Sequence, residues 1–302
     1  MGLGPKGGEV AMFQRILIAT DGTRLADDLV ECAASLRHLG LREALLLHVF
    51  DARHVGGLSI DLEEQLRPSL ARQVEALGRA GVAATARTRL GLPAHDIHAE
   101  AEAWDASLVL LGSTGGGRLA GFPLGSTAAA LLHSATRPVL LVPAARLEEG
   151  SGEPSCADWR EGFLGHVLHP TDFSDGSEQA FLALAEIVRR ASPRVTLLHV
   201  QDEVRLRPHL EHRLEEFDRI DRERLARLAH RLTGLGAPEV RSEIGHGRPI
   251  PFVVERSRAG DVTLVVAGCQ GRGYVREVFL GSVAGALARL ARIPVLFVPL
   301  PR

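Results

Sequence analysis

The sequence predicts an α/β protein made of two doubly wound parallel sheets, and three observations support this fold class. The first is an internal repeat, in which RILIATDGT (15–23) matches VLHPTDFS (167–174). The second is a set of short apolar runs, such as LVLL (108–111) and VLLV (139–142), that suit strands buried on both faces. The third is the alternation of these runs with longer segments of helical period, which implies right-handed crossovers between parallel strands.

Five strands and four helices are expected in the first copy. The strands lie near residues 15–19, 44–50, 82–89, 107–111 and 138–142, and the helices near residues 24–38, 60–78, 94–104 and 125–134. The second copy repeats this order. Its offset is 151 residues at the first strand (172 − 21) and 156 residues at the fourth (268 − 112), so the second copy carries a five-residue insertion between them.

The repeat divides the chain into a first domain at residues 1–146, a linker at 147–163 and a second domain at 164–302. The linker sequence EEGSGEPSCADWREG (148–162) has no apolar period and contains Gly, Ser and Pro. Each domain is large enough to bury a core of its own. Two copies of one domain are therefore expected, joined by a flexible segment.

Composition excludes several classes of function. A net charge of −2 and a pI near 6.7 provide no basic field for nucleic acid. No apolar run approaches the ~20 residues that cross a membrane, and the N-terminus lacks the apolar stretch of a signal peptide. Cys32, Cys156 and Cys269 lie far apart and form no Cys-x-x-Cys pair, which indicates free thiols. We expect a soluble cytoplasmic protein.

One glycine and serine spacing occurs in both copies: Gly-x-x-Gly, nine further residues, then Gly-Ser. Its members are Gly112, Gly115, Gly125 and Ser126 in the first copy, and Gly268, Gly271, Gly281 and Ser282 in the second. Each motif follows a predicted buried strand and ends where an apolar helix begins. Glycines let a ligand approach the backbone, and a helix start offers N–H groups to an anion. The spacing therefore predicts a phosphate site in each copy.

Other interpretations of these residues are less favourable. Ser126 and Ser282 could be ordinary helix N-caps and the glycines ordinary turn residues, but the recurrence of the full spacing favours binding. A P-loop is excluded because the only lysine is Lys6 and no Gly-x-x-x-x-Gly-Lys-Ser/Thr occurs. The Gly-x-Gly-x-x-Ala pattern at 115–120 follows the fourth strand instead of the first, which disfavours a dinucleotide fingerprint.

Asp21 and Asp172 follow the first strand of each copy. Ligands of doubly wound sheets bind outside the carboxyl ends of strands where the winding reverses. If the first and fourth strands are neighbours there, each aspartate and its glycine loop line one crevice. A carboxylate beside phosphates must face the sugar or a Mg²⁺ ion. The alternative is an Asx-turn that caps the first helix.

Together these motifs resemble those of the universal stress protein family, and the resemblance covers both copies almost end to end. It implies a sheet order of 3-2-1-4-5 and ATP as ligand, with Mg²⁺. The backbone of Val49 or Val200 would bind the adenine edge, the aspartates would lie by the ribose or metal, and the glycines and serines would hold phosphates. The implied nucleotide-binding residues are Ala19, Asp21, Val49, Gly112, Gly115, Gly116, Gly125, Ser126, Thr127, Pro170, Asp172, Val200, Gly268, Gly271, Arg272, Gly281, Ser282 and Val283.

The first copy departs from the family pattern in two places. Ala19 replaces a proline that Pro170 retains, and Arg118 is displaced from the place that Arg272 takes in the second copy. The basic phosphate contact of the first copy is therefore in question.

Histidines are interpreted as structural. His95 and His98 lie three apart on a predicted helix, as do His209 and His212, but no third metal ligand accompanies either pair. We assign both pairs to solvated helix faces and expect no metal bound directly by the protein. His48 and His199 recur at strand ends as packing residues.

Three classes of function remain. They are a nucleotide-responsive regulatory protein, a slow ATPase or nucleotidyl-transfer enzyme, and a dimerisation module with degenerate sites. Intact loops disfavour the last, and the missing lysine, paired carboxylates and activated nucleophile disfavour catalysis. We expect an ATP-binding stress-tolerance protein with little or no turnover and an unidentified regulatory protein partner.

The fifth strands, near 138–142 and 294–298, lie at sheet edges in the implied order and invite pairing. We expect them to pair antiparallel in an intramolecular pseudo-dimer, with both ATP sites facing away from the seam. We also expect arginine at Leu141 and Leu296 to separate the copies without unfolding either. The sequence shows no patch that demands dimerisation of whole chains.

Overall fold

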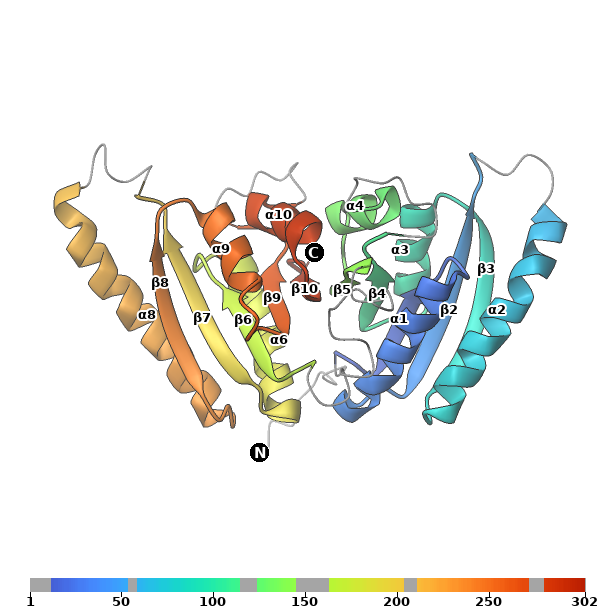
Figure 1. The fold of residues 1–302 in the computed structure, drawn as a ribbon, viewed down its shortest axis with the longest axis horizontal. Coiled ribbons are helices and arrows are strands. Elements are labelled where there is room, and N and C mark those ends of the chain that lie inside the picture. Colours follow the sequence, from blue (N-terminus) through green and yellow to red (C-terminus); the bar gives the residue numbers. More distant parts are fainter. Residues whose placement is uncertain are drawn as a thin grey trace, which may run out of the picture.

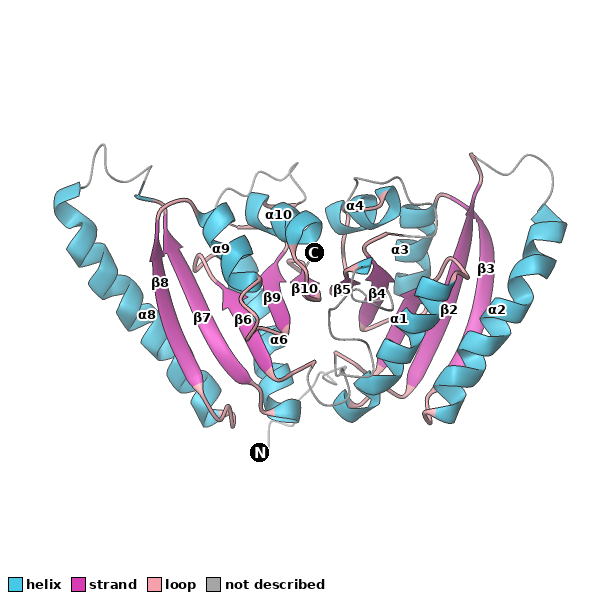
Figure 2. Cartoon of the chain, viewed as in Figure 1, coloured by secondary structure: helices cyan, strands magenta, loops and turns pink. Residues whose placement is uncertain are grey.

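The computed structural model describes residues 12–53, 59–114, 124–144, 163–203, 211–271 and 280–301. Its two copies stand side by side, each with a twisted sheet between helices (Figures 1 and 2). The expected linker lies outside the described residues, except for its last position. No helix in the described part of the chain is long and apolar enough to cross a membrane.

The first copy contains every element expected from its sequence. In chain order they are β1 Arg15–Ala19, α1 Arg24–Ser35, a 3-10 turn Leu36–Leu39, β2 Glu43–Asp51, α2 Ser59–Arg79, β3 Ala83–Gly91, α3 Pro93–Ala103, β4 Leu108–Gly112, α4 Ser126–His133 and β5 Val139–Val142. Its first helix ends at Ser35 and the chain tightens into the 3-10 turn, which Gly40 closes with a φ of 101°.

The second copy repeats the order. Its elements are β6 His166–Pro170, α6 Asp175–Ala191, β7 Arg194–Gln201, a 3-10 turn Glu211–Arg213, α8 Leu214–Gly234, β8 Val240–His246, α9 Pro249–Ser257, β9 Leu264–Gly268, α10 Ser282–Leu290 and β10 Val295–Val298. Helix α8 runs for 21 residues. Helix α6 runs for 17 residues and is therefore longer than its 12-residue counterpart α1.

All ten strands form one sheet in the order β3-β2-β1-β4-β5-β10-β9-β6-β7-β8. Each copy contributes the expected order 3-2-1-4-5 with parallel neighbours. The copies meet at β5 and β10, which pair antiparallel with Leu296 opposite Leu140. The expected antiparallel pairing of the fifth strands is confirmed, and it turns two edge strands into the centre of a single sheet.

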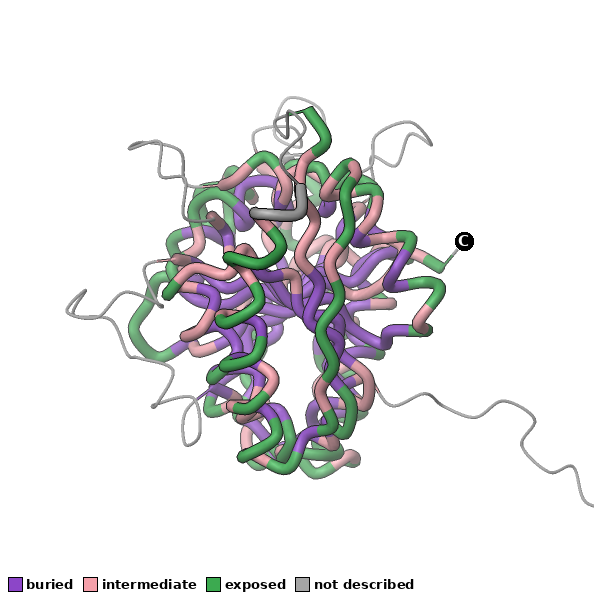
Figure 3. The backbone as a smooth tube through the Cα atoms, turned by 90° about the vertical axis from the view of Figure 1, so that its right-hand side faces the viewer, coloured by how far each residue is buried: buried purple, intermediate pink, exposed green. Residues whose placement is uncertain are grey.

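The hydrophobic core forms a layer on each face of this sheet and continues through the seam. Helices α1, α2, α6 and α8 cover one layer, and α3, α4, α9 and α10 cover the other. Leu140 and Leu296 belong to the first layer, whereas Leu141 and Phe297 belong to the second, all at most 2% exposed. The end-on view shows buried segments in the middle of the molecule, with exposed segments toward its periphery (Figure 3).

The cysteines differ from expectation. Cys32, which is fully buried in α1, is disulfide-bonded. Cys269 is a free thiol, and burial raises its pKa to about 12. Cys156 lies outside the described residues. The interpretation of free thiols is therefore wrong for Cys32, and it failed because sequence spacing shows only local pairs, whereas a fold brings distant cysteines together.

Candidate functional site

Each copy has a cavity at the carboxyl ends of its strands, where β1 and β4, or β6 and β9, are neighbours. The first cavity measures about 1180 Å³ and the second about 1240 Å³. From the predicted sets, the first is lined by Ala19, Asp21, Val49, Gly112, Gly125, Ser126 and Thr127, and the second by Pro170, Asp172, Val200, Gly268, Gly271, Gly281, Ser282 and Val283. Gly115, Gly116, Arg118 and Arg272 lie outside the described residues.

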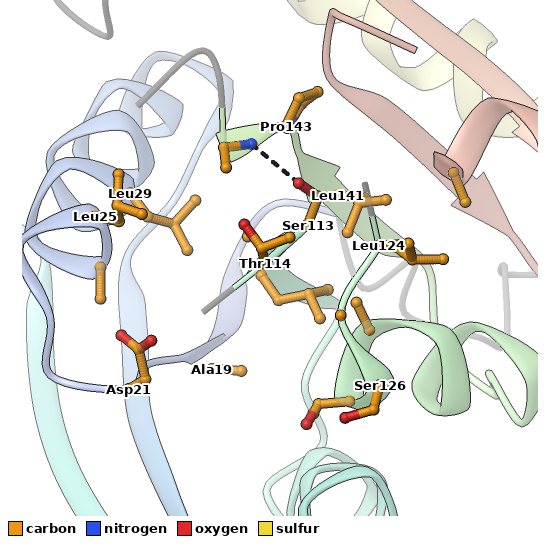
Figure 4. Close-up of a pocket in the computed structure, with 18 of the residues that line it drawn as sticks. Ala19, Asp21, Leu25, Leu29, Ser113, Thr114, Leu124, Ser126, Leu141 and Pro143 are labelled. Carbon is orange, nitrogen blue, oxygen red and sulfur yellow. Dashed lines mark hydrogen bonds between the residues drawn. The ribbon is translucent and has the colours of Figure 1, made fainter. Parts of the chain in front are cut away.

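Asp21 stands at one side of the first cavity and Ser126 at another, with Ala19 between them in the close-up view (Figure 4). The Oδ1 of Asp21 accepts hydrogen bonds from the backbone amide of Thr23 at 3.1 Å and from its hydroxyl at 2.6 Å. Asp172 makes the same pair of contacts with Ser174. Both aspartates therefore form Asx-turns after the first strand of their copy.

The helix caps are other residues. The hydroxyl of Thr23 accepts from the amide of Ala26 at 3.4 Å, and that of Ser174 accepts from the amide of Ser177 at 3.3 Å. The aspartates thus position the capping residue, and their carboxylates still line the cavities. The interpretation in which an aspartate itself caps the helix is wrong.

The two glycine loops close in the same way. The amide of Gly125 donates to the carbonyl of Ser113, and the amide of Gly281 donates to that of Cys269, each at 2.7 Å. These bonds bring the start of α4 or α10 back over the end of its preceding strand. Gly125 and Gly281 occupy the N-cap positions.

Ser126 and Ser282 are consequently the first helical residues, and the N-cap interpretation of these serines is wrong. No side chain in the described part of the chain caps either helix. Both serines are exposed at the cavity side, next to first-turn amides that have no partner within the helix itself. A helix start in this state is suited to an anion.

Not every motif glycine is needed for a ligand. A Cβ at Gly268 would lie 2.5 Å from the carbonyl oxygen of Gly176 in α6, and one at Gly176 would lie 2.1 Å from that of Gln270. These two glycines let α6 pack against the loop. Gly271 differs, since its Cβ would lie 2.7 Å from the Oδ2 of Asp172, beside the cavity. The glycine motif and the aspartate therefore meet directly in the second copy.

The recurring histidines tie strand ends to the aspartate turns. The Nδ1–H of His48 donates to the carbonyl of Thr20, and that of His199 donates to the carbonyl of Thr171, each at 2.8 Å. Burial lowers the pKa of His48, against the raising effects of this bond and of Asp21. The two imidazoles hold β2 and β7 against the turn, which agrees with a packing role.

The helical histidine pairs are not equivalent. His98 places its Nε2 3.0 Å from the carbonyl of Leu131, so it joins α3 to α4. His95 is exposed, with its Nδ1 3.6 Å from Asp96. His212 is exposed as well, and its neighbour in the pair, His209, lies outside the described residues.

A polar cluster in the second cavity was missed from the sequence. The Oδ2 of Asp221 in α8 lies 3.3 Å from the Nε2 of His199 and accepts from the Nε2 of Gln201 at 3.0 Å. All three residues are buried and line the cavity. The available signal was an acidic residue at 221, four positions before the buried Leu225, on the apolar face of a helix.

The first cavity extends to the seam between the copies. Its described lining includes Leu287, Val295, Arg258, Arg289 and Arg292, all from the second copy. Figure 4 shows the ribbon of that copy beside Leu141. The expectation that both sites face away from the seam is therefore wrong for the first, because the pairing of β5 with β10 brings α10 against its crevice. The described lining of the second cavity comes from its own copy.

Known proteins resemble this chain over both copies. The universal stress protein family model matches residues 12–143 and 164–299. A universal stress protein of Mycolicibacterium smegmatis is 32% identical over 197 residues, which are 64% of this chain and 62% of that protein. One of Mycobacterium tuberculosis is 30% identical over 200 residues, 64% of this chain and 61% of that protein. The matches thus span about three-fifths of the length of these curated relatives.

A solved structure supports the fold. The crystal structure of a universal stress protein from Archaeoglobus fulgidus covers 96% of this chain and 99% of its own, with a TM-score of 0.71 at 19% identity. A functionally unknown protein from Pseudomonas aeruginosa covers 96% and 95%, with a TM-score of 0.63 at 17% identity. Both similarities are similarities of fold, and they extend over the two copies together.

Proposed function

Because the chain belongs to the universal stress protein family, we propose that it is an ATP-binding regulatory protein with one nucleotide site in each copy and little or no turnover. The observation that carries the proposal is the convergence, around one cavity per copy, of an aspartate turn, a glycine loop and the exposed first residue of a helix.

The phosphates would lie at the helix start. Amides of the first turn of α4, with the hydroxyl of Ser126, would donate to phosphate oxygens, and α10 with Ser282 would do the same in the second copy. Each hydrogen bond to a charged group contributes roughly 1.5–3 kcal/mol. Three or four, less the cost of ordering the ligand, account for the ~8 kcal/mol of a micromolar complex.

The nucleoside would lie toward the second strand of each copy. Val49 and Val200 line the cavities at the ends of β2 and β7, where backbone groups reach a base edge. Asp21 and Asp172 would face the ribose or a Mg²⁺ ion that offsets their repulsion of phosphate. The carboxylate positions favour this, since Asp172 Oδ2 borders Gly271 of the phosphate loop.

Hydrolysis has one observation in its favour, the pair of His199 and Asp221 in the second cavity. A histidine that acts as a general base must have a ring nitrogen available to accept the proton that it removes. The Nδ1 of His199 is bonded to the carbonyl of Thr171, and its Nε2 faces Asp221. With both ring nitrogens engaged, His199 is placed to hold the site together, which supports slow turnover.

The proposal is tested by nucleotide analysis of the denatured protein and by calorimetry with ATP and Mg²⁺. We expect two sites in the parent and one in the Gly271→Val variant, whose side chain would displace Asp172. The matched control is Gly260→Val, where a Cβ meets nothing within 4 Å. A parent protein that neither carries nor binds a nucleotide refutes the proposal.

A further inference from the structure

Among the described residues, the permanent positive charge that lines the first cavity comes from the second copy. Its described lining contains three arginines, Arg258, Arg289 and Arg292, and all of them belong to the second copy. The described residues that the first copy contributes include one carboxylate, Asp21, and no arginine or lysine. Among the described side chains of this lining, permanent positive charge therefore stands only on the side facing the seam.

Local contacts fix where two of these arginines, Arg258 and Arg289, stand. Arg258 donates from Nε and Nη2 to the carbonyl oxygen of Leu290, at 3.2 and 2.8 Å, and so is held at the end of α10. The guanidinium of Arg289 lies back along the same helix, 3.6 Å from the position of a Cβ on Gly285. All three arginines are exposed at the cavity rim, so they reach it without the cost of burying a charge.

This charge is not repeated by the internal symmetry. The positions 156 residues earlier, equivalent to Arg258, Arg289 and Arg292, are Glu102, His133 and Thr136. The second cavity instead has its own Arg224 and Arg248. The two copies thus share a fold and a loop spacing but obtain positive charge from different places.

We propose that the first site is a composite site, in which Arg258, Arg289 and Arg292 of the second copy attract the phosphates of a nucleotide held by the first. This inference rests on the proposed function. It assigns these arginines a specificity role: they should favour ligands with more phosphates, because the charge of the ligand rises while its nucleoside contacts stay the same. It also makes the pairing of β5 with β10 a condition for full affinity at the first site.

The test uses the full chain carrying Gly271→Val, so that the first site is measured alone. In this background Arg258, Arg289 and Arg292 are all changed to Gln. Binding of ATP, AMP and adenosine is followed by calorimetry at low and moderate salt. We expect ATP affinity to fall roughly tenfold, since each exposed pair contributes modestly, and AMP affinity to fall less. Adenosine affinity should change by less than about twofold, and the salt dependence of ATP binding should flatten.

Two controls accompany it. Arg194, Arg227 and Arg241 are exposed arginines of the second copy outside the described lining of either cavity, and changing all three to Gln gives the same change in net charge. This variant should bind ATP like its background. The Arg→Lys version of the rim triple keeps the charge and should retain most of the ATP affinity, even if the Gln version folds poorly.

The outcomes distinguish the composite site from nucleotide binding itself. If the rim triple and its background bind ATP equally, or if both Gln triples weaken ATP equally, the composite site is wrong while nucleotide binding stands. If Gly271→Val alone binds no ATP while the parent binds one, the first copy has no nucleotide site and the inference falls with that part of the proposed function.

Discussion

The Oδ1 of Asp21 accepts two hydrogen bonds from Thr23, one from its amide and one from its hydroxyl. The same carboxylate lines the first cavity, so one side chain both shapes the turn after β1 and faces the site. Asp172 and Ser174 repeat this relationship. Structure and ligand contact are therefore not competing explanations for these aspartates, because a carboxylate has two oxygens and several acceptor positions.

This double use makes Asp21→Asn informative. The amide oxygen of asparagine still accepts from Thr23, so we expect the free energy of unfolding in urea to change by less than about 1 kcal/mol. Removal of the charge should change the Mg²⁺ dependence of ATP binding, measured by titration with and without a chelator. Asp21→Ala is the comparison, and it should be less stable because the amide and the hydroxyl of Thr23 both lose their shared acceptor. Identical Mg²⁺ dependence in Asn and parent proteins would place the metal elsewhere.

ATP turnover should be slow, at the level of minutes per event or slower. The reason is that the only lysine lies far from both glycine loops in sequence and that both nitrogens of His199 are engaged. Phosphate release is the measurement, with Asp21→Asn and Asp172→Asn as controls for contaminating activity. A rate above ~1 s⁻¹ that both substitutions abolish would contradict the prediction.

Much of this fold could be read from residue patterns. The runs at 108–111 and 139–142 are apolar without interruption because parallel strands inside a doubly wound sheet are buried on both faces. Asp21 and Gly112 could be placed in one crevice because they follow neighbouring strands. Such inferences need only periodicity and chain direction.

Other features depend on contacts between distant residues. Asp221 lies beside His199 because α8 packs on β7, and this contact cannot be predicted from an isolated acidic residue in a helix. The approach of Arg289 to the first cavity requires the register of β5 against β10. Gly268 looked like a ligand-binding glycine, yet the close approach of Gly176 accounts for it.

His169 should make the protein sensitive to acid. It is fully buried in β6, and burial lowers its pKa from 6.5 to about 4 while its Nδ1–H donates to the carbonyl of Val266. The unfolded chain takes up a proton near pH 6.5, but the native state does so only near pH 4. The free energy of unfolding is therefore higher above pH 6.5 than at pH 4 by roughly 3 kcal/mol, and this difference is lost as the pH falls from 6.5 toward 4.

The first copy supplies the natural replacement, since Ile18 stands at the position equivalent to His169. His169→Ile should weaken the loss of stability between pH 6.5 and pH 4, measured by urea unfolding across that range. His230→Ile changes an exposed histidine and should leave the pH profile as in the parent. Equal acid sensitivity in His169→Ile and the parent would assign the effect to other groups.

The seam should make the two copies unfold together. Arginine at Leu141 and Leu296 was expected to separate intact copies, but these side chains are about 2% and 1% exposed and point into opposite core layers. The same substitutions should instead unfold both copies, because each buries a charge without a partner.

Leu296→Ala is the milder probe of this coupling, and we expect it to lower the free energy of unfolding by about 2–5 kcal/mol. Leu182→Ala, at an exposed site in α6, should cost less than about 0.5 kcal/mol. Circular dichroism and tryptophan fluorescence should report one transition for both variants, since Leu296 packs in a layer that also contains Leu140 of the first copy. Two separated transitions in the parent would show that the shared sheet does not couple the copies.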